Sequence, residues 1–227
     1  MVSDAGIHDQ IMVKNLVKSF QRQKVLEQVS FAVPARGRVL LLGPSGAGKS
    51  TLLRIIAGLD LPDAGEVYLT GELASTSSWA LAPNRRNLGF VFQNPTLWPH
   101  MTVAENVLFG LVNQPRREAQ QHVAALLDKA RISHVADKYP DQISGGEAKR
   151  AALVRSIAPC PKILLVDEPF ANLDAATKMT LLAFLLAMTD AFHMTLVYVT
   201  HDADEAAQVG GQIVRLKPPY LDVSAGI

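Results

Sequence analysis

One segment decides the fold of this chain: Gly43-Pro44-Ser45-Gly46-Ala47-Gly48-Lys49-Ser50. It follows an apolar run at residues 39–42 and precedes residues 51–57, which have the composition of a helix. A buried strand, a glycine-rich turn and a helix in this order form a P-loop, in which backbone N–H groups point at phosphate oxygens. The N-terminus of the helix adds about half a positive charge. The segment therefore predicts a phosphate-binding site.

Two side chains of this loop have the chemistry that a nucleotide needs. Lys49 would reach the β- and γ-phosphates as a point charge, and the hydroxyl of Ser50 would ligate Mg²⁺. The alternative is a chance match to a short motif, which the strand before it and the helix after it make a poor explanation.

Composition and charge limit the class of protein. The chain has 227 residues, of which 48% are hydrophobic, so it can form one large α/β domain or two joined lobes. Its 22 basic and 21 acidic residues leave no basic surplus, so we expect no nucleic-acid partner. Cys160 is the one cysteine, which excludes an internal disulfide and favours a reducing compartment.

No targeting or membrane-spanning segment is predicted. Residues 1–9 lack the basic and apolar regions of a signal peptide, and the longest apolar run, residues 181–188, is too short to span a bilayer. We therefore expect a soluble, cytoplasmic protein whose role at a membrane depends on a partner.

The order of patterns along the chain predicts two lobes. Residues 11–17 and 25–33 read as antiparallel strands before the P-loop, and residues 102–133 and 144–158 read as helices. Strands at 163–166 and 195–200 flank a helix that Asp174 would cap. We predict an α/β nucleotide-binding lobe with an antiparallel β subdomain at about 11–92 and 160–217, and a helical lobe inserted at about 93–159.

A second polar element ends the buried strand at 163–166. Asp167 and Glu168 follow it directly, and two adjacent carboxylates there are not core filling. Because adjacent strand residues face opposite ways, one can address a metal ion and the other a different atom. We assign Asp167 to Mg²⁺ through water and Glu168 to the attacking water as general base, an effect of about 10²–10⁴ in rate. The alternative is a solvated pair that caps a helix.

The segment Ile143-Ser144-Gly145-Gly146-Glu147 makes the pattern specific. It resembles the signature motif of ATP-binding-cassette (ABC) ATPases and stands shortly before the Asp167-Glu168 strand, as in that family. The resemblance runs from about Met12 to Leu216. It implies a P-loop NTPase of the ABC cassette type, with an antiparallel β subdomain and an inserted helical subdomain, that uses ATP and Mg²⁺.

The resemblance also implies roles for residues outside the P-loop. Phe20 matches the aromatic residue that stacks on adenine, and Gln93 matches the Q-loop glutamine, which contacts water, metal and the transmembrane partner. His201 matches the switch histidine, which bonds the γ-phosphate. Asn172-Leu173-Asp174 matches the D-loop, which makes contacts across a dimer. Residues 144–147 would face the ATP held by the opposite subunit of that head-to-tail dimer.

The complete set of expected site residues has three parts. The catalytic residues are Glu168, His201 and Gln93, and the metal ligands are Ser50, Gln93 and Asp167. The nucleotide-binding residues are Phe20, Val25, Gly43, Pro44, Ser45, Gly46, Ala47, Gly48, Lys49, Ser50, Thr51, Ser144, Gly145, Gly146, Glu147 and Asp174.

Each assignment outside the P-loop has an ordinary structural alternative. Phe20 can be a hydrophobic anchor, Gln93 can cap a turn, and residues 144–146 can form a glycine turn between helices. His201 can be a satisfied residue at a strand end, and Asp174 can be only a helix cap.

The sequence departs from the family pattern at Glu147, where glutamine is commoner. A carboxylate about 6 Å from phosphate would cost about 3 kcal/mol at an effective dielectric of about 20, and solvent would reduce this cost. Gly210-Gly211 also stands where an Asp-Arg pair often follows the switch histidine. The chain ends soon after Leu216, so we expect no regulatory domain.

The resemblance implies the ATPase subunit of an ABC transporter, bound to permease subunits at the inner face of the membrane. We expect a homodimer, or a pair with a close paralogue, and a solute-binding protein in the wider complex. Residues 87–106 look most like the import branch, such as thiamine, ferric-iron, molybdate or polyamine uptake. Exposed Leu97, Trp98 and Met101 would form the groove for a permease helix, although lobe packing explains them as well.

Four alternative functions remain. Glu147 also resembles cassettes of lipoprotein-release or division machinery, which would mean export or mechanical coupling. A soluble ABC ATPase acting on DNA or ribosomes would usually have two cassettes or long coiled coils in one chain. A P-loop GTPase would need an Asn-Lys-x-Asp segment, which is absent. A binding module without turnover would not need Glu168.

Overall fold

A computed structural model describes residues 9–21, 23–171 and 173–217. Its contacts divide the chain into two compact units: Met1–Asn87 with Val197–Ile227 form unit 1, and Leu88–Leu196 form unit 2. The N-terminal residues 1–8 and the D-loop residue Asn172, which entered the expectations above, lie outside the described residues.

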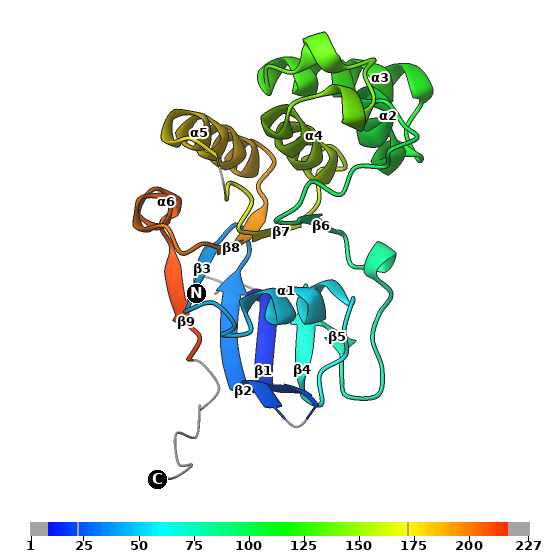
Figure 1. The fold of residues 1–227 in the computed structure, drawn as a ribbon. Helices are drawn as coiled ribbons and strands as arrows, with labels where there is room; N and C mark the ends of the chain where they lie inside the picture. Colours follow the sequence, from blue (N-terminus) through cyan, green and yellow to red (C-terminus); the bar gives the residue numbers. More distant parts are fainter. Residues whose placement is uncertain (1–8, 22, 172, 218–227) are drawn as a thin grey trace, which may run out of the picture. The chain divides into compact units, whose positions relative to one another are not determined.

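Unit 1 contains a four-stranded antiparallel sheet (Figure 1). Its strands are β1 (Asp9–Phe20), β2 (Gln23–Pro34), β4 (Ala64–Leu69) and β5 (Glu72–Ser75), in the order β2-β1-β4-β5. In this register Val13 lies opposite both Phe31 and Val67, and all three side chains are buried. This confirms the predicted antiparallel strands at the start of the chain.

Unit 1 also carries the P-loop. β3 (Arg38–Leu42) pairs in parallel with β9 (Gln212–Arg215), and the loop after β3 leads into α1 (Lys49–Ala57). The division between the units falls inside β8 (Thr195–Val199), so the order within unit 1 is β8-β3-β9. The helix α6 (Ala203–Val209) follows β8. The predicted strand, glycine-rich turn and helix are therefore present.

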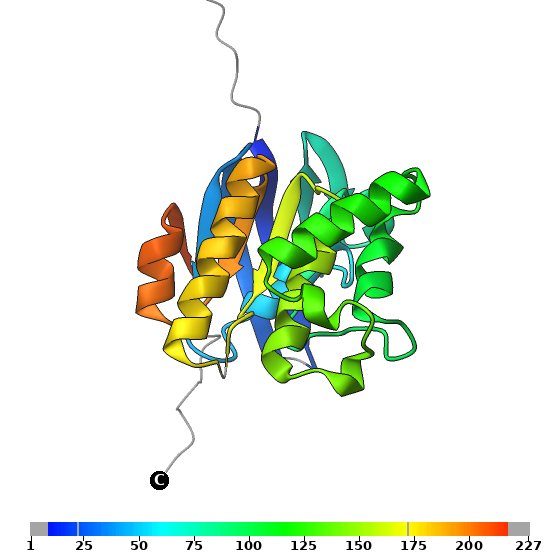
Figure 2. The same ribbon diagram turned by 90° about the horizontal axis from the view of Figure 1, so that it is seen from above.

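Unit 2 combines short strands with most of the helices. β6 (Leu88–Val91) pairs in parallel with β7 (Ile163–Asp167), and β8 begins beside β7. The helices are α2 (Val103–Leu108), α3 (Arg116–Lys129), α4 (Gly145–Ile157) and α5 (Ala175–Ala191). Figures 1 and 2 both show α2, α3 and α4 grouped together.

Four short 3-10 helices complete the described elements. η1 (Pro83–Arg85) lies in unit 1; η2 (Phe109–Leu111), η3 (Ser133–Val135) and η4 (Pro140–Gln142) lie in unit 2.

Close packing joins α4 to β6 within unit 2. A Cβ atom on Gly89 would lie 2.4 Å from the carbonyl oxygen of Ser156, so only glycine fits at this position of β6. The Ser156 hydroxyl donates a hydrogen bond to the carbonyl oxygen of Phe90 at 2.8 Å. β6 and β7 therefore belong to the same unit as α4. We predicted instead that both strands belong to the nucleotide-binding lobe and that the helical lobe begins at residue 93. The predicted lobe boundaries stay a prediction.

A buried arginine fixes the C-terminus of α1, the helix that begins with Lys49. Arg86 donates to the carbonyl oxygens of Ile55 and Ile56 at 3.3 and 2.8 Å. It also donates to three acceptors at the edge of unit 1, each at 2.8 Å: Leu81 O, Ala74 O and Ser75 Oγ. All five acceptors are neutral, and burial lowers the pKa of Arg86 to about 10. Gly58, which ends α1 at φ 77°, leaves the space that this side chain occupies.

Replacing Arg86 with methionine is expected to lower the free energy of unfolding by about 3 kcal/mol, because buried carbonyl oxygens lose their donors. Urea unfolding measures the change. Arg85→Met is the matched control, since Arg85 is exposed and neighbouring, and it should change stability by less than about 0.5 kcal/mol. Equal effects of the two substitutions would show that Arg86 does not anchor α1.

Candidate functional site

The P-loop needs glycine at two positions for different reasons. Gly46 and Gly48 have φ angles of 79° and 84°, in the left-handed region that other residues rarely adopt. A Cβ atom on Gly48 would lie 2.7 Å from both the carbonyl oxygen of Val25 and a methyl carbon of Leu26. A Cβ atom on Gly46 would meet nothing within 4 Å, so at Gly46 the backbone angle alone favours glycine.

Lys49 places its positive charge on this loop. Its side chain is only 6% exposed, and its ammonium group donates to the carbonyl oxygens of Gly43 at 2.8 Å and Pro44 at 3.0 Å. Ser50 is the exposed second residue of α1, and no acidic residue lies in the first turn of this helix. The loop therefore combines a cation, a helix N-terminus and a hydroxyl, which together suit a phosphate group.

A pocket of about 290 Å³ lies beside the P-loop in unit 1. Val25, Leu26, Ala47 and Leu216 are among its lining residues, so the structure brings the predicted residues Val25 and Ala47 together. Phe20 is not among the lining residues. It lies at the end of β1, is 49% exposed, and has the ammonium nitrogen of Lys18 5.3 Å from its ring centroid. The assignment of Phe20 to adenine stacking stays a prediction.

Asp167 is the last residue of β7 in unit 2 and Glu168 follows it; both are half-buried, whereas the four residues before them are buried. β7 ends at Asp167, and Glu168 has a φ angle of 43°. Strand alternation, on which we based the different roles of the two carboxylates, therefore does not reach Glu168. A left-handed backbone sets its direction instead, at a cost of about 1–3 kcal/mol for a residue that is not glycine. Backbone strain of this kind is commonly found at functional sites.

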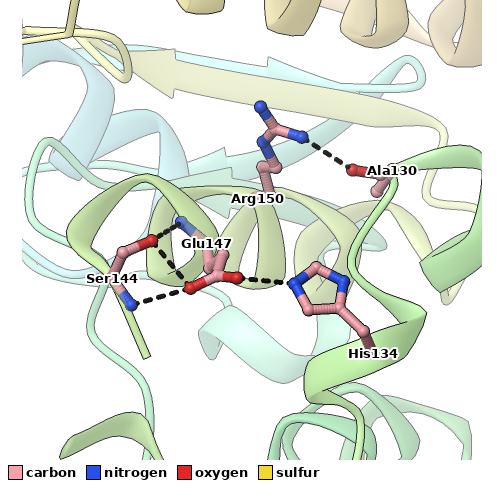
Figure 3. Close-up of polar contacts among 5 residues, drawn as sticks. All are labelled: Ala130, His134, Ser144, Glu147 and Arg150. Atoms are coloured by element: carbon pink, nitrogen blue, oxygen red, sulfur yellow. Dashed lines mark hydrogen bonds and ion pairs between the residues drawn. The ribbon is translucent and has the colours of Figure 1, made fainter. Parts of the chain in front are cut away.

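The signature segment forms the N-terminus of α4 (Figure 3). Ser144 is the N-cap: its hydroxyl accepts the N–H of Glu147 at 3.3 Å, and a Glu147 carboxylate oxygen accepts the N–H of Ser144 at 2.8 Å. This reciprocal arrangement is a capping box. Cβ atoms on Gly145 and Gly146 would meet nothing within 4 Å, so the packing of this chain does not require these glycines. Because glycine has no side chain, these two positions leave the backbone at the start of α4 open to close approach by another group.

The side chain of Glu147 turns back onto the cap. Its second oxygen lies 2.8 Å from Nε2 of His134 in η3. Hydrogen bonds from the Ser144 hydroxyl, the Ser144 N–H and His134 lower the pKa of Glu147 to about 2. These internal partners therefore reduce the electrostatic cost that we expected from a carboxylate close to phosphate. No pattern in the sequence predicted this contact between His134 and Glu147.

Gln93 is exposed and lies two residues past β6, on an irregular segment that leads to α2. Buried Asn106 holds the end of this segment: its amide donates to the carbonyl oxygens of Trp98, Met101 and Thr102 at 3.0–3.1 Å. A groove of about 480 Å³ lies beside it within unit 2, lined in part by Phe90, Phe92, Trp98, Phe109 and Arg155.

Of the three apolar residues that we expected to form a groove for a permease helix, Trp98 alone is among the lining residues of this one. Leu97, Trp98 and Met101 are half-buried rather than exposed, and Leu97 and Met101 are not among the lining residues. The aromatic rings of Phe90 and Phe109 and the guanidinium of Arg155, 4.8 Å from the Trp98 ring, complete the wall instead. Arg155 also donates to Thr96 O and Thr96 Oγ1 at 2.6 and 3.0 Å.

His201 and Asp174 both lie just before helices. His201 is exposed and follows β8 by two residues. The helix after it is anchored by the buried Tyr198 hydroxyl, which donates to Glu205 at 2.8 Å; burial, and then the charge of Glu205, raise the pKa of Tyr198. Asp174 caps α5 by accepting the N–H of Thr177 at 2.9 Å, and hydrogen bonds from Thr177 lower the pKa of Asp174.

Comparison with known proteins decides the family. Residues 26–171 match the family described as "ABC transporter". This chain belongs to the ABC transporter family. The sulfate/thiosulfate import ATP-binding protein CysA of Thermosynechococcus vestitus is 46% identical over 206 residues, which are 90% of this chain and 60% of that protein. CysA of Pseudomonas aeruginosa is 43% identical over 218 residues, 93% of this chain and 65% of that protein. The chain thus spans somewhat less than two thirds of the length of these curated relatives.

Solved structures agree with this assignment. The ATP-binding cassette MJ0796, in a dimeric post-hydrolysis state bound to ADP and Pi, has a TM-score of 0.83 and 32% sequence identity to this chain. The match covers 92% of this chain and 95% of that one. The predicted ABC cassette fold is therefore confirmed, as is the prediction of an ABC ATP-binding domain.

The residues expected to bind Mg²⁺ in an ABC ATPase have suitable chemistry. The hydroxyl of Ser50 belongs to unit 1, and the amide of Gln93 and the carboxylate of Asp167 belong to unit 2. These are the oxygen ligands that Mg²⁺ prefers. Among the described residues, no group of three or more His, Cys, Asp or Glu side chains could hold a metal ion. Within the same part of the chain, no helix is long and apolar enough to cross a membrane.

Proposed function

We propose that this chain binds and hydrolyses Mg-ATP and thereby drives the import of a small solute through a membrane permease. The observation that carries the proposal is the P-loop, where left-handed Gly46 and Gly48 and the buried ammonium group of Lys49 form a phosphate cradle at the N-terminus of α1. The matched curated relatives are sulfate/thiosulfate import proteins, which supports an importer over the export alternative and makes these oxyanions the first solutes to test.

We propose that two copies of the chain, or one copy and a close paralogue, enclose two ATP molecules. The open space at Gly145 and Gly146 supports this arrangement, because these glycines leave the N-terminus of α4 accessible to a phosphate held by another copy. The dimeric state of MJ0796 supports it as well. Ser144, Gly145, Gly146 and Asp174 would then act on the ATP of the opposite copy.

The proposed reaction is an in-line attack of water on the γ-phosphorus. Glu168 accepts the proton of the water as the new P–O bond forms, and the bond to the ADP oxygen breaks. Lys49 and the N–H groups of the P-loop hold the negative charge that develops on the phosphate oxygens. Bound Mg²⁺ would neutralise the β- and γ-phosphates, with Ser50, Gln93 and Asp167 as its ligands. His201 would bond the γ-phosphate and position the water.

We propose that permease subunits bind at the groove beside Trp98 and hold the chain at the inner face of the membrane. The groove has aromatic walls with Arg155 at its edge, which suits a short helix that inserts an apolar side chain. A solute-binding protein would complete the importer. In this arrangement the segment from Gln93 to α2 links ATP to transport.

Replacing Trp98 with alanine is expected to reduce solute uptake by about tenfold or more, because large aromatic residues dominate docking energies. Hydrolysis should fall much less. Uptake and phosphate release are measured together in liposomes that contain the cognate permease complex. Trp79→Ala is the matched control, since Trp79 is the second tryptophan, is 48% exposed and lies in unit 1. Unchanged uptake in the Trp98 variant would place the permease elsewhere.

A further inference from the structure

The signature segment carries a negative charge, that of Glu147, at the place where the proposed function requires it to bind a negatively charged phosphate. The Glu147 carboxylate accepts hydrogen bonds from Ser144 N at 2.8 Å and Ser144 Oγ at 2.7 Å, and it contacts His134 Nε2 at 2.8 Å (Figure 3). Hydrogen bonds from Ser144 and then His134 hold the pKa of this carboxyl well below its usual range, at about 2. It lies in the first turn of α4, the same helix N-terminus that would receive the γ-phosphate.

Among the residues that the structure describes, His134 is the ionisable side chain that pairs with this carboxylate and can cancel its charge. Ser144 offers only neutral donors. A neutral imidazole with its proton on Nε2 still donates a hydrogen bond, but it leaves the charge of Glu147 uncompensated; an imidazolium both donates and neutralises. Histidine side chains change between these forms at about pH 5–8. The His134 side chain is 64% exposed and that of Glu147 is 24% exposed, so the imidazole exchanges protons with solvent directly.

We propose that His134 is a positioning residue of the signature segment: as an imidazolium it holds Glu147 on the N-cap of α4 and cancels its charge, so that this helix N-terminus accepts the γ-phosphate of ATP bound to a second copy. The inference rests on the proposed function, and it adds a regulation of that site by pH. Loss of the proton from His134 leaves one uncompensated negative charge beside the phosphate and weakens ATP binding.

Other charged groups on the neighbouring elements do not replace His134. Arg150, one turn further along α4, directs its guanidinium to the carbonyl oxygen of Ala130 at 3.3 Å (Figure 3). Only Ser144 and His134 act on the carboxyl of Glu147 to lower its pKa. The remaining ionisable residues on the segments next to η3 and α4, and on these elements themselves, are Glu105 on α2, Asp128 and Lys129 at the end of α3, Arg131, Asp137, Lys138, Tyr139, Asp141, Lys149 and Arg155.

The test compares the pH dependence of the KM for Mg-ATP in a set of full-length variants. His134→Gln keeps a donor but removes the charge, and Glu147→Gln removes the charge that needs compensation while keeping a capping box. The double variant combines both changes. His193→Gln is the matched control, because His193 is also exposed in unit 2 and lies outside the site. Steady-state hydrolysis is measured from about pH 6 to about pH 8.5.

We expect the ratio of the wild-type KM to the KM of Glu147→Gln to rise by about three- to fivefold from the acidic to the basic end of this range. This is the size of effect that an exposed ion pair has. His134→Gln should already show the high KM at the acidic end. In the Glu147→Gln background the same substitution should have no effect, and the control should follow the wild type. Any pH effect that does not involve the His134–Glu147 pair is common to all variants, so the ratio between variants removes it.

Two results would overturn the inference, and they are distinguishable from each other. In the first, the wild type hydrolyses ATP, but His134→Gln raises the KM by the same factor whether residue 147 is glutamate or glutamine. His134 then does not act through Glu147, and only this inference fails. If the wild type neither binds nor hydrolyses ATP, the proposed function fails and the inference fails with it.

Discussion

Replacing Lys49 with alanine is expected to weaken ATP binding by about 10²–10³-fold. The ammonium group is nearly buried against the loop carbonyls, so the triphosphate meets a charge that solvent screens little. Losing such a charged partner costs about 3–4 kcal/mol. The left-handed glycines that shape the loop remain, so the cradle itself should persist.

Isothermal titration calorimetry with Mg-ATP measures this loss. Lys129→Ala is the matched control, because Lys129 is exposed at the end of α3. It should bind ATP like the wild type, and both variants should unfold at the same denaturant concentration as the wild type. An unchanged affinity in the Lys49 variant would remove this residue from the nucleotide site and with it the main support for the proposed function.

Replacing Glu168 with glutamine is expected to lower the rate of hydrolysis by about 10²–10⁴-fold while ATP still binds. Glutamine has nearly the same shape and cannot accept the proton of the attacking water. The left-handed backbone at position 168 fixes where the side chain begins, and the substitution does not alter the β7 strand before it.

Single-turnover phosphate release measures the chemical step without the contribution of product release. Glu118→Gln serves as the control, since Glu118 is exposed on α3 and the change in charge is the same. Hydrolysis at the wild-type rate in the Glu168 variant would contradict the assignment of the general base, and Asp167 would have to be reconsidered for that role.

The sequence predicted the elements that depend on local rules. The P-loop requires glycine at fixed backbone positions. The positions of Lys49 and Ser50 directly after the loop follow from the helix that they begin. Asp174 is an N-cap in the structure, as its residue type and position predicted, and Ser144 begins the helix that we expected from residue 144. Long apolar runs such as β7 were also clear, because a continuous apolar run of this length is typical of a buried parallel strand.

Tertiary contacts determine what the sequence could not reveal. His134 and Glu147 are thirteen positions apart, so no helical or strand spacing links them. Asn106 and Arg86 bind backbone carbonyls, which look alike in every sequence. β5 and β9 have only four residues each and too little alternation to be recognised. The direction of Glu168 depends on one φ angle that residue type does not specify.

The central claim is that two copies enclose ATP between the P-loop of one and the signature segment of the other. Sedimentation velocity of Glu168→Gln with Mg-ATP, and separately with Mg-ADP, tests it most directly, since this variant should retain ATP long enough for the complex to be observed. We predict a dimer with Mg-ATP and a monomer with Mg-ADP. A variant that binds Mg-ATP and remains a monomer, both alone and with the permease complex, would contradict the claim.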